Sequence, residues 1–213
     1  MLYTSFIFIV GLIDDRKELA PGSKLIFTIM PTFILMNDGF YINNLGLYNF
    51  GTIELGKIYV IFTLLCILLL INAFNYIDGI DGLALSQFLI SISYLTFITN
   101  DETLHLFYKL ILLPLIINLL FNFNIFSKIK IFLGNCGSLI LGFLLSFTII
   151  YLAKFKGVHP SFLIWSVFLY VYEFLSVNII RMKYKKDIFK GGKDHIHHAI
   201  YFLCKKPDTY KYE

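Results

Sequence analysis

Two adjacent carboxylates stand near the beginning of the sequence, in Gly11-Leu-Ile-Asp14-Asp15-Arg16, where an apolar segment ends. Carboxylates this close can hold a hard cation or share a proton, because two like charges resist joint ionisation. Ordinary interfacial charge explains the pair equally well. Lys24, ten residues on, is either a phosphate contact or a flanking lysine whose charge reaches water.

The strongest group is Asn72-Ala-Phe-Asn75-Tyr-Ile-Asp78-Gly-Ile-Asp81-Gly82. Its two asparagines lie in or beside a long apolar run, where polar groups are costly unless they are used. Asp-Gly-x-Asp-Gly alone is also typical of a turn, and an EF-hand is excluded because the later ligands are missing. Four polar residues spaced by three drift by roughly 60° per step on an ideal helix. The helix must therefore bend or end at the glycines if all four are to converge.

Two further groups follow along the chain. Gly134-Asn135-Cys136-Gly137-Ser138 opens an apolar run, and its backbone N–H groups suit a phosphate, although a flexible entry turn fits as well. His195, His197 and His198 can bind a metal, contact a diphosphate or shuttle a proton, or can lie in a solvated basic tail. Glu173 and Arg181 stand eight residues apart on one helical face, as functional groups or as structural partners.

These groups interrupt a chain that is 58% hydrophobic and 15% charged, which is far too little charge for a soluble domain of this size. Four uncharged runs approach the ~20 residues that a helix needs to cross a bilayer. The sequence therefore predicts an all-α polytopic transmembrane bundle over 1–180 and a basic cytoplasmic tail over 181–213. Three widely spaced cysteines argue against structural disulfides. Seven apolar segments are expected, at 1–13, 24–37, 57–77, 83–98, 106–126, 137–153 and 160–180.

Alternating spans place 14–23, 78–82, 127–136 and the tail on one side of the membrane, and 38–56, 99–105 and 154–159 on the other. The first side carries Arg16, Lys17, Lys128, Lys130 and nine basic residues of the tail, whereas the second side and its margins carry four lysines. The excess of positive charge predicts that the first side is cytoplasmic. The four polar groups all fall on that side.

The sequence resembles the polyprenyl-phosphate N-acetylhexosamine-1-phosphate transferase family. The resemblance rests on four segments in this order: GLIDDR (11–16), NAFNYIDGIDGLA (72–84), FLGNCGS (132–138) and DHIHH (194–198). The resemblance covers residues 11 to about 200 and is closer to the UDP-sugar branch than to the muramoyl-pentapeptide branch. It implies transfer of a sugar 1-phosphate from a UDP-N-acetylhexosamine to a polyprenyl phosphate, with release of UMP, in the bacterial cytoplasmic membrane. Membrane lipid is the other expected partner, no nucleic acid is expected, and a homodimer is left open.

The resemblance also implies roles for individual residues. The catalytic set is Asp14, Asp15, Asp78, Asp81, His195, His197 and His198. The substrate-binding set is Lys24, Asn72, Asn75, Gly134, Gly137, Ser138 and Arg181. Mg²⁺, or Mn²⁺ in its place, is expected on Asp15, Asp78 and Asn135.

The sequence departs from the family pattern at two points. Asn135 stands where members usually have an aspartate that binds magnesium, which removes one charge from the site. The Asp pair arrives at residue 14, whereas members carry further spans before it, so a fragment or a shortened member is expected. An impaired relative that binds nucleotide-sugar or a partner is therefore the second hypothesis. An ion-coupled transporter using Glu173 is the third, although the halves lack the inverted repeat that this class often shows.

Overall fold

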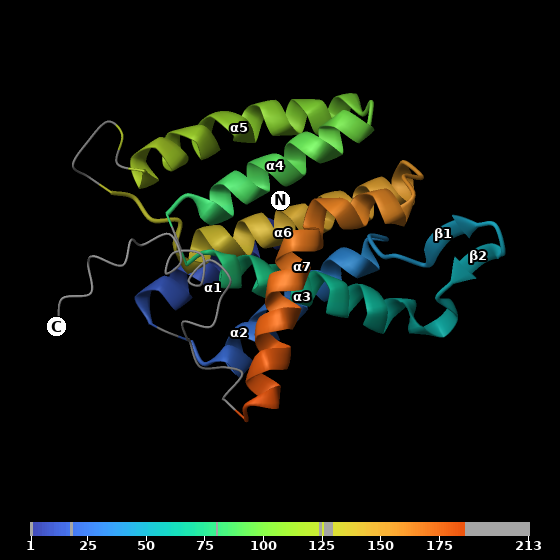
Figure 1. Ribbon diagram of the computed structural model, residues 1–213, viewed down its shortest axis with the longest axis horizontal. Coiled ribbons are helices and arrows are strands. Elements are labelled where there is room, and N and C mark those ends of the chain that lie inside the picture. Colours follow the sequence, from blue (N-terminus) through green and yellow to red (C-terminus); the bar gives the residue numbers. More distant parts are fainter. Residues whose placement is uncertain (1, 18, 80, 124, 126–129, 186–213) are drawn as a thin grey trace, which may run out of the picture.

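The computed structural model describes residues 2–17, 19–79, 81–123, 125 and 130–185 (Figure 1). The seven expected apolar segments all form helices, with ends that move by a few residues. In chain order the elements are α1 (Leu2–Arg16), α2 (Pro21–Asn37), β1 (Asn44–Tyr48), β2 (Gly51–Glu54), a 3₁₀ turn (Gly56–Ile58), α3 (Tyr59–Ile77), α4 (Leu83–Ile98), α5 (Glu102–Asn122), α6 (Gly134–Phe155) and α7 (Pro160–Lys183).

Four of these helical segments are long and apolar enough to cross a membrane: Gly56–Ile77, α5, α6 and α7. Helix α4 is apolar but has only 16 residues. Helix α7 runs to 24 residues because it continues beyond its uncharged part, burying Glu173, Val177 and Arg181 along one face. The chain is therefore an all-α polytopic integral membrane protein. Both cysteines in the described ranges, Cys66 and Cys136, are free thiols.

Helix α6 is the most enclosed of the four long segments, with 61% of its apolar window buried, compared with 11% for α5. It packs against α1 and α3, and α3 in turn packs against α7. Aromatic rings fill the centre of the bundle, where the ring of Phe74 stacks on Tyr170 at 5.0 Å between centroids and meets Phe88 edge-on. Helix α5 lies at the edge of the bundle beside α4 (Figure 1), and its outer leucines face the surroundings.

Because the helices alternate in direction, the loops that connect them lie at two opposite ends of the bundle. Helix α3 ends and α6 begins at the left of the bundle in Figure 1, and the strands β1 and β2 lie at the right. The segment 38–56, expected to be a loop, contains an antiparallel hairpin that pairs Leu47 with Thr52. A two-stranded hairpin is marginal alone. Here it is held by His159 at the start of α7, whose Nε2 lies 3.1 Å from the Leu47 carbonyl oxygen.

At the end of the bundle where the hairpin lies, the side chain of Asp101 links the start of α5 to the end of α6. Its carboxylate accepts the Leu104 N–H at 2.8 Å as the cap of α5 and forms an ion pair with Lys156. The hydrogen bond from Lys156 is the main cause that holds the pKa of Asp101 well below its usual range, with smaller contributions from Thr103 and Leu104.

Asp101→Asn is expected to lower the thermal midpoint of unfolding, because it removes the charge from this ion pair. A carboxyl group with a depressed pKa stabilises the fold above its unfolded pKa of about 3.9, and this stabilisation is lost as the pH falls through the folded value. The difference in midpoint between wild type and variant should therefore shrink in acid. Thermal melts of the protein in detergent from pH 7 downward measure it, with Glu102→Gln, an exposed neighbouring acid, as the control. A difference that is unchanged in acid contradicts the prediction.

Candidate active site

The carboxylate of Asp15, near the end of α1, caps the beginning of α6. Its Oδ1 accepts the backbone N–H of Asn135 at 2.8 Å, and its Oδ2 accepts that of Cys136 at 3.1 Å. The first N–H groups of a helix have no partner within the helix and carry its positive dipole end. Because each carboxylate oxygen has two acceptor positions and Asp15 is exposed, the group remains able to bind a second ligand. The N–H groups expected for a phosphate here donate to Asp15.

Gly134 permits this close approach. Its φ of +69° lies in the left-handed region, and a Cβ at this position would stand 3.0 Å from Asp15 Oδ2. A side chain would therefore strain the backbone and crowd the carboxylate. Gly137, also expected to bind substrate, has the Leu133 side chain against the place where its Cβ would be.

Gly11 sets the distance between α1 and α6, one helical turn before Asp15. A Cβ on Gly11 would overlap the Cα of Cys136, so the two backbones can meet only without a side chain here. Small residues permit such close approach of helices in membranes. The closeness of the helices at Gly11 is what brings Asp15 within hydrogen-bonding distance of α6.

Gly11→Ala is expected to destabilise the fold by about 1–3 kcal/mol, because the added methyl group meets backbone that cannot rotate away. Gly22→Ala is the matched control, since nothing lies within 4 Å of the Cβ it would add. Thermal melts of both variants in the same detergent measure the effect. Equal midpoints for the two variants contradict the close packing of α1 on α6.

The end of α3 contributes an amide and a second carboxylate. Asn75 donates from Nδ2 to Asn135 Oδ1 at 3.0 Å and to Ser138 Oγ at 2.8 Å. Asp78 is the half-buried residue that follows the last turn of α3. Burial, together with the negative charge of Asp15, raises the pKa of Asp78 to about 6. The charge of Asp15, which caps α6, thus acts on the carboxyl group that follows α3.

The structure places other expected residues outside this group. Asp14 is buried, and its Oδ2 lies 2.6 Å from Lys24 Nζ while its Oδ1 accepts the Leu19 N–H at 3.0 Å. Its carboxylate therefore holds α1 to α2. Asn72 donates to the carbonyl oxygen of Leu68 on its own helix at 2.6 Å.

The remaining expected residues lie around the group or outside the described ranges. Asp81 is exposed and forms an ion pair with Lys130 at 2.5 Å. The buried guanidinium of Arg181 has its Cζ 5.9 Å from the centre of the Tyr76 ring, next to Asn75 in sequence. The three histidines at 195, 197 and 198 lie beyond residue 185, outside the described residues.

Lys130 and Tyr76 lie near the site but are not among the residues expected from the sequence. Lys130 contributed only to the count of basic charge, although it faces Asp81 in the structure. Tyr76 lies inside the central polar group, but the sequence assigned no role to it. Two features of the sequence could have identified them: a basic residue shortly before Gly134 and an aromatic residue beside Asn75.

The side chains at this end of the bundle suit a hard divalent cation whose remaining coordination positions are filled by a substrate. No cluster of three or more His, Cys, Asp or Glu side chains that could hold a metal occurs within the described ranges. Mg²⁺ is typically bound by one or two carboxylates, with substrate phosphates and water in the other positions. Asp15 and Asp78 therefore fit Mg²⁺ as a partner of a phosphorylated substrate.

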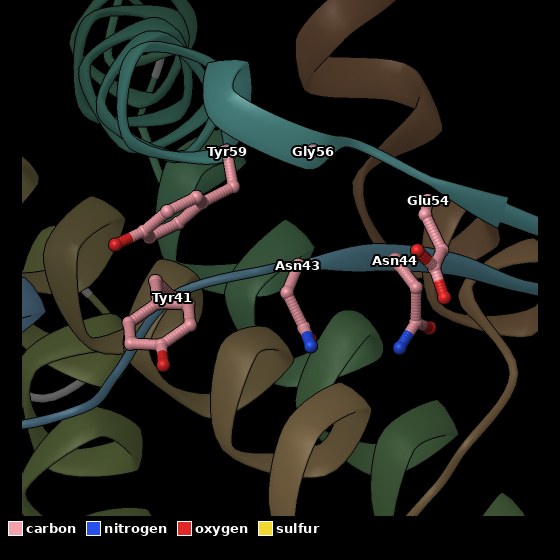
Figure 2. A pocket seen from close by; sticks show the side chains of 6 residues that line it. All are labelled: Tyr41, Asn43, Asn44, Glu54, Gly56 and Tyr59. Atoms are coloured by element: carbon pink, nitrogen blue, oxygen red, sulfur yellow. The ribbon is translucent and has the colours of Figure 1, made fainter.

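A polar pocket of about 320 Å³ lies at the other end of the bundle, beside the hairpin. Figure 2 shows the rings of Tyr41 and Tyr59 close together at one side and Asn44 beside Glu54 at the other. Lys154 sits over the Tyr41 ring, with Nζ 3.1 Å from its centre. The lining residues include none of the expected site residues, so the pocket is separate from the carboxylate group.

Residues 1–153 match glycosyl transferase family 4, a range that includes α1 to α5 and nearly all of α6. The chain is 27% identical over 202 residues to the probable undecaprenyl-phosphate N-acetylglucosaminyl 1-phosphate transferase of Bacillus subtilis (strain 168), covering 91% of this chain and 55% of that protein. It is 25% identical over 200 residues to the undecaprenyl-phosphate alpha-N-acetylglucosaminyl 1-phosphate transferase of Escherichia coli (strain K12), covering 90% and 54%.

Another relative is a phospho-N-acetylmuramoyl-pentapeptide-transferase of Streptococcus agalactiae serotype Ia, which is 30% identical over 203 residues, covering 87% of this chain and 57% of that protein. The chain thus spans about half the length of the curated relatives it matches.

Proposed function

Because the chain belongs to glycosyl transferase family 4, we propose that it transfers an N-acetylhexosamine 1-phosphate from a UDP-sugar to a polyprenyl phosphate and releases UMP. Relatives named for undecaprenyl phosphate and N-acetylglucosamine make this lipid and this sugar the first to test. The observation that carries the proposal is the joining of α1 and α3 at the start of α6, where Asp15 accepts the N–H of Asn135 and Asn75 donates to Asn135 and Ser138.

The proposed reaction makes one phosphorus–oxygen bond and breaks another. An oxygen of the polyprenyl phosphate attacks the β-phosphorus of the UDP-sugar, and the bond from this phosphorus to the oxygen bridging the two phosphates breaks. UMP leaves with the bridging oxygen. Bound Mg²⁺ would neutralise the charge of the diphosphate and of the departing UMP.

The side chains of this protein would position the reactants. Asp15 and Asp78 would hold the cation at the membrane boundary, and their separate helices would keep its place fixed relative to α6. Asp14, buried against Lys24, would act as a positioning residue that keeps the end of α1 in place. The apolar outer faces of the helices would accommodate the polyprenyl chain.

The same end of the bundle would face the cytoplasm, where UDP-sugars are made. Arg16, Lys17, Lys130 and Lys183 belong to this end, and a basic excess is typical of the cytoplasmic side. We therefore place the proposed active site on the cytoplasmic face of a bacterial inner membrane.

The test uses the full chain in nanodiscs with undecaprenyl phosphate and UDP-N-acetylglucosamine, and UMP is measured by chromatography. UMP should appear only when lipid, nucleotide-sugar and Mg²⁺ or Mn²⁺ are all present, and EDTA should abolish it. UDP-N-acetylgalactosamine, tested in parallel, identifies the sugar. Folded protein that releases no UMP with either sugar would contradict the proposal.

A further inference from the structure

We propose that the polar pocket beside the hairpin binds the headgroup of a membrane lipid that carries both a phosphate and a primary ammonium, the phosphoethanolamine group. In this arrangement the ammonium lies at Glu54, and the phosphate lies toward Tyr41 and Lys154. The pocket is at the opposite end of the bundle from the carboxylate group (Figure 1). The inference therefore stands apart from the proposed function, and it is tested without turnover.

Hydrogen bonds and strand pairing hold the walls of this pocket in place. The hydroxyl group of Thr63, fully buried on α3, accepts the Ile42 N–H at 3.0 Å and donates to the Tyr59 carbonyl oxygen at 2.8 Å. On the hairpin side, Asn44 stands directly opposite Glu54 in the pairing of β1 with β2. The pocket of about 320 Å³ is thus formed before a ligand arrives, as is usual for binding sites of small groups.

The pocket lies at the level expected for lipid headgroups. Tyr59 is the first residue of α3, near the beginning of the apolar segment Gly56–Ile77, and Lys154 is in the last turn of α6. Both segments are long and apolar enough to cross a membrane. Tyrosine and lysine at the ends of such segments are typical of the boundary between lipid and water. A lipid headgroup is therefore the most concentrated ligand at this position.

A negative and a positive side chain stand at opposite sides of the pocket. Glu54 lines one side and Tyr41 the other, as Figure 2 shows, and Lys154 Nζ lies 3.1 Å from the centre of the Tyr41 ring. Neither Glu54 nor Lys154 forms an ion pair with any residue that the structure describes. A ligand with one negative and one positive group is attracted by both side chains, whereas a neutral sugar is attracted by neither and an anion only by Lys154.

The hydrogen-bonding groups of the pocket determine which end of the ligand lies where. The hydroxyl groups of Tyr41 and Tyr59 and the side-chain amide of Asn43 can all donate, which suits phosphate oxygens. The carboxylate of Glu54 only accepts, so it suits a primary ammonium, which has three N–H groups. A ligand ammonium is disfavoured at the Tyr41 ring, because Lys154 already supplies the cation there.

The experiment uses native mass spectrometry of the full chain in detergent micelles, with three dioleoyl lipids that differ only in their headgroup. Phosphatidylethanolamine carries a primary ammonium, phosphatidylcholine carries a quaternary ammonium without N–H groups, and phosphatidylglycerol carries no ammonium. The wild type should bind phosphatidylethanolamine at least about tenfold more tightly than either of the others, which is the size of one charge-assisted hydrogen bond.

Variants with matched controls locate the site. Glu54→Gln removes a charge from an exposed residue, so the fold should remain intact and the preference for phosphatidylethanolamine over phosphatidylcholine should disappear. Glu102→Gln, at an exposed acid at the same end of the bundle, should keep the preference. Lys154→Gln should weaken binding of all three lipids, since they share the phosphate, whereas Lys109→Gln, at an exposed lysine of α5, should not. The Glu54→Gln result decides the matter even where Lys154→Gln fails to fold.

Three results would each overturn the proposed site: equal affinity of the wild type for the three lipids, a preference that survives in Glu54→Gln, or a preference lost equally in Glu102→Gln. Soluble glycerophosphoethanolamine, which has the same charged group without acyl chains, distinguishes a lipid from a free headgroup. At the same concentration as the lipid it should displace almost none of it, because buried acyl chains add to the affinity of the lipid. Displacement of half of the bound lipid would exclude a lipid as the occupant.

Discussion

Asp15→Asn should lower the rate of UMP release by about 100-fold or more, because loss of a direct ligand costs more than the 10- to 100-fold typical of an orienting partner. The variant keeps the size of the side chain but removes the negative charge that would attract the cation. It also replaces one of the two oxygens that accept N–H groups of α6. An amide has only one oxygen for these contacts, and its NH₂ group would face an N–H donor.

The measurement for Asp15→Asn is the initial rate of UMP release over a range of Mg²⁺ concentrations. Part of the loss should be recovered at high Mg²⁺, because one carboxylate remains on Asp78. Asp38→Asn makes the same chemical change after the last turn of α2, away from the carboxylate group, and should leave the rate unchanged. A rate for Asp15→Asn within a factor of a few of wild type would exclude Asp15 from cation binding.

Below about pH 6, UMP release should fall by about tenfold for each pH unit, as the ionised fraction of Asp78 falls. Burial and the neighbouring Asp15 charge raise the pKa of this carboxyl group, so protonation occurs within an accessible pH range. A protonated carboxyl group binds a divalent cation poorly, and raising the Mg²⁺ concentration should therefore shift the inflection to lower pH.

The raised pKa of Asp78 has the opposite effect on the stability of the fold, which should decrease as the pH rises. The folded state holds its proton on Asp78 up to about pH 6, whereas the unfolded chain loses it near pH 4. The contribution of this group to stability therefore declines as the pH rises between these values, and above them the charge destabilises the fold. Asp78→Asn should be inactive, and without added cation it should melt at a higher temperature than wild type at neutral pH.

Thermal melts and rates of wild type and Asp78→Asn between pH 4 and 8 test both consequences. Asp81→Asn is the comparison for the melts, because Asp81 is exposed and paired with Lys130. A rate profile without an inflection near pH 6, or an Asp78→Asn protein that melts below wild type at neutral pH, would refute the assigned role of burial.

Much of the architecture follows from composition along the chain. Each expected apolar segment became a helix, because the backbone of a chain in lipid must satisfy its own hydrogen bonds. Alternation of these segments was enough to predict that Asp15, Asn75 and Asn135 lie at one end of the bundle, and their hydrogen bonds confirm it. The hairpin over 44–54 escaped prediction because its two short strands depend on contact with His159.

Adjacent residues show what the sequence left undecided. Asp14 and Asp15 are indistinguishable by type, yet a rotation of about 100° per residue along α1 turns one toward Lys24 and the other toward α6. Asn72 and Asn75 likewise separate, one bonding to its own helix and the other to Asn135. Transfer of a segment from water to lipid depends on that segment alone, so sequence determines which segments are buried. Which carboxylate meets which helix depends on the rotation of each helix and on close approach at Gly11 and Gly134, and those are properties of the packed bundle.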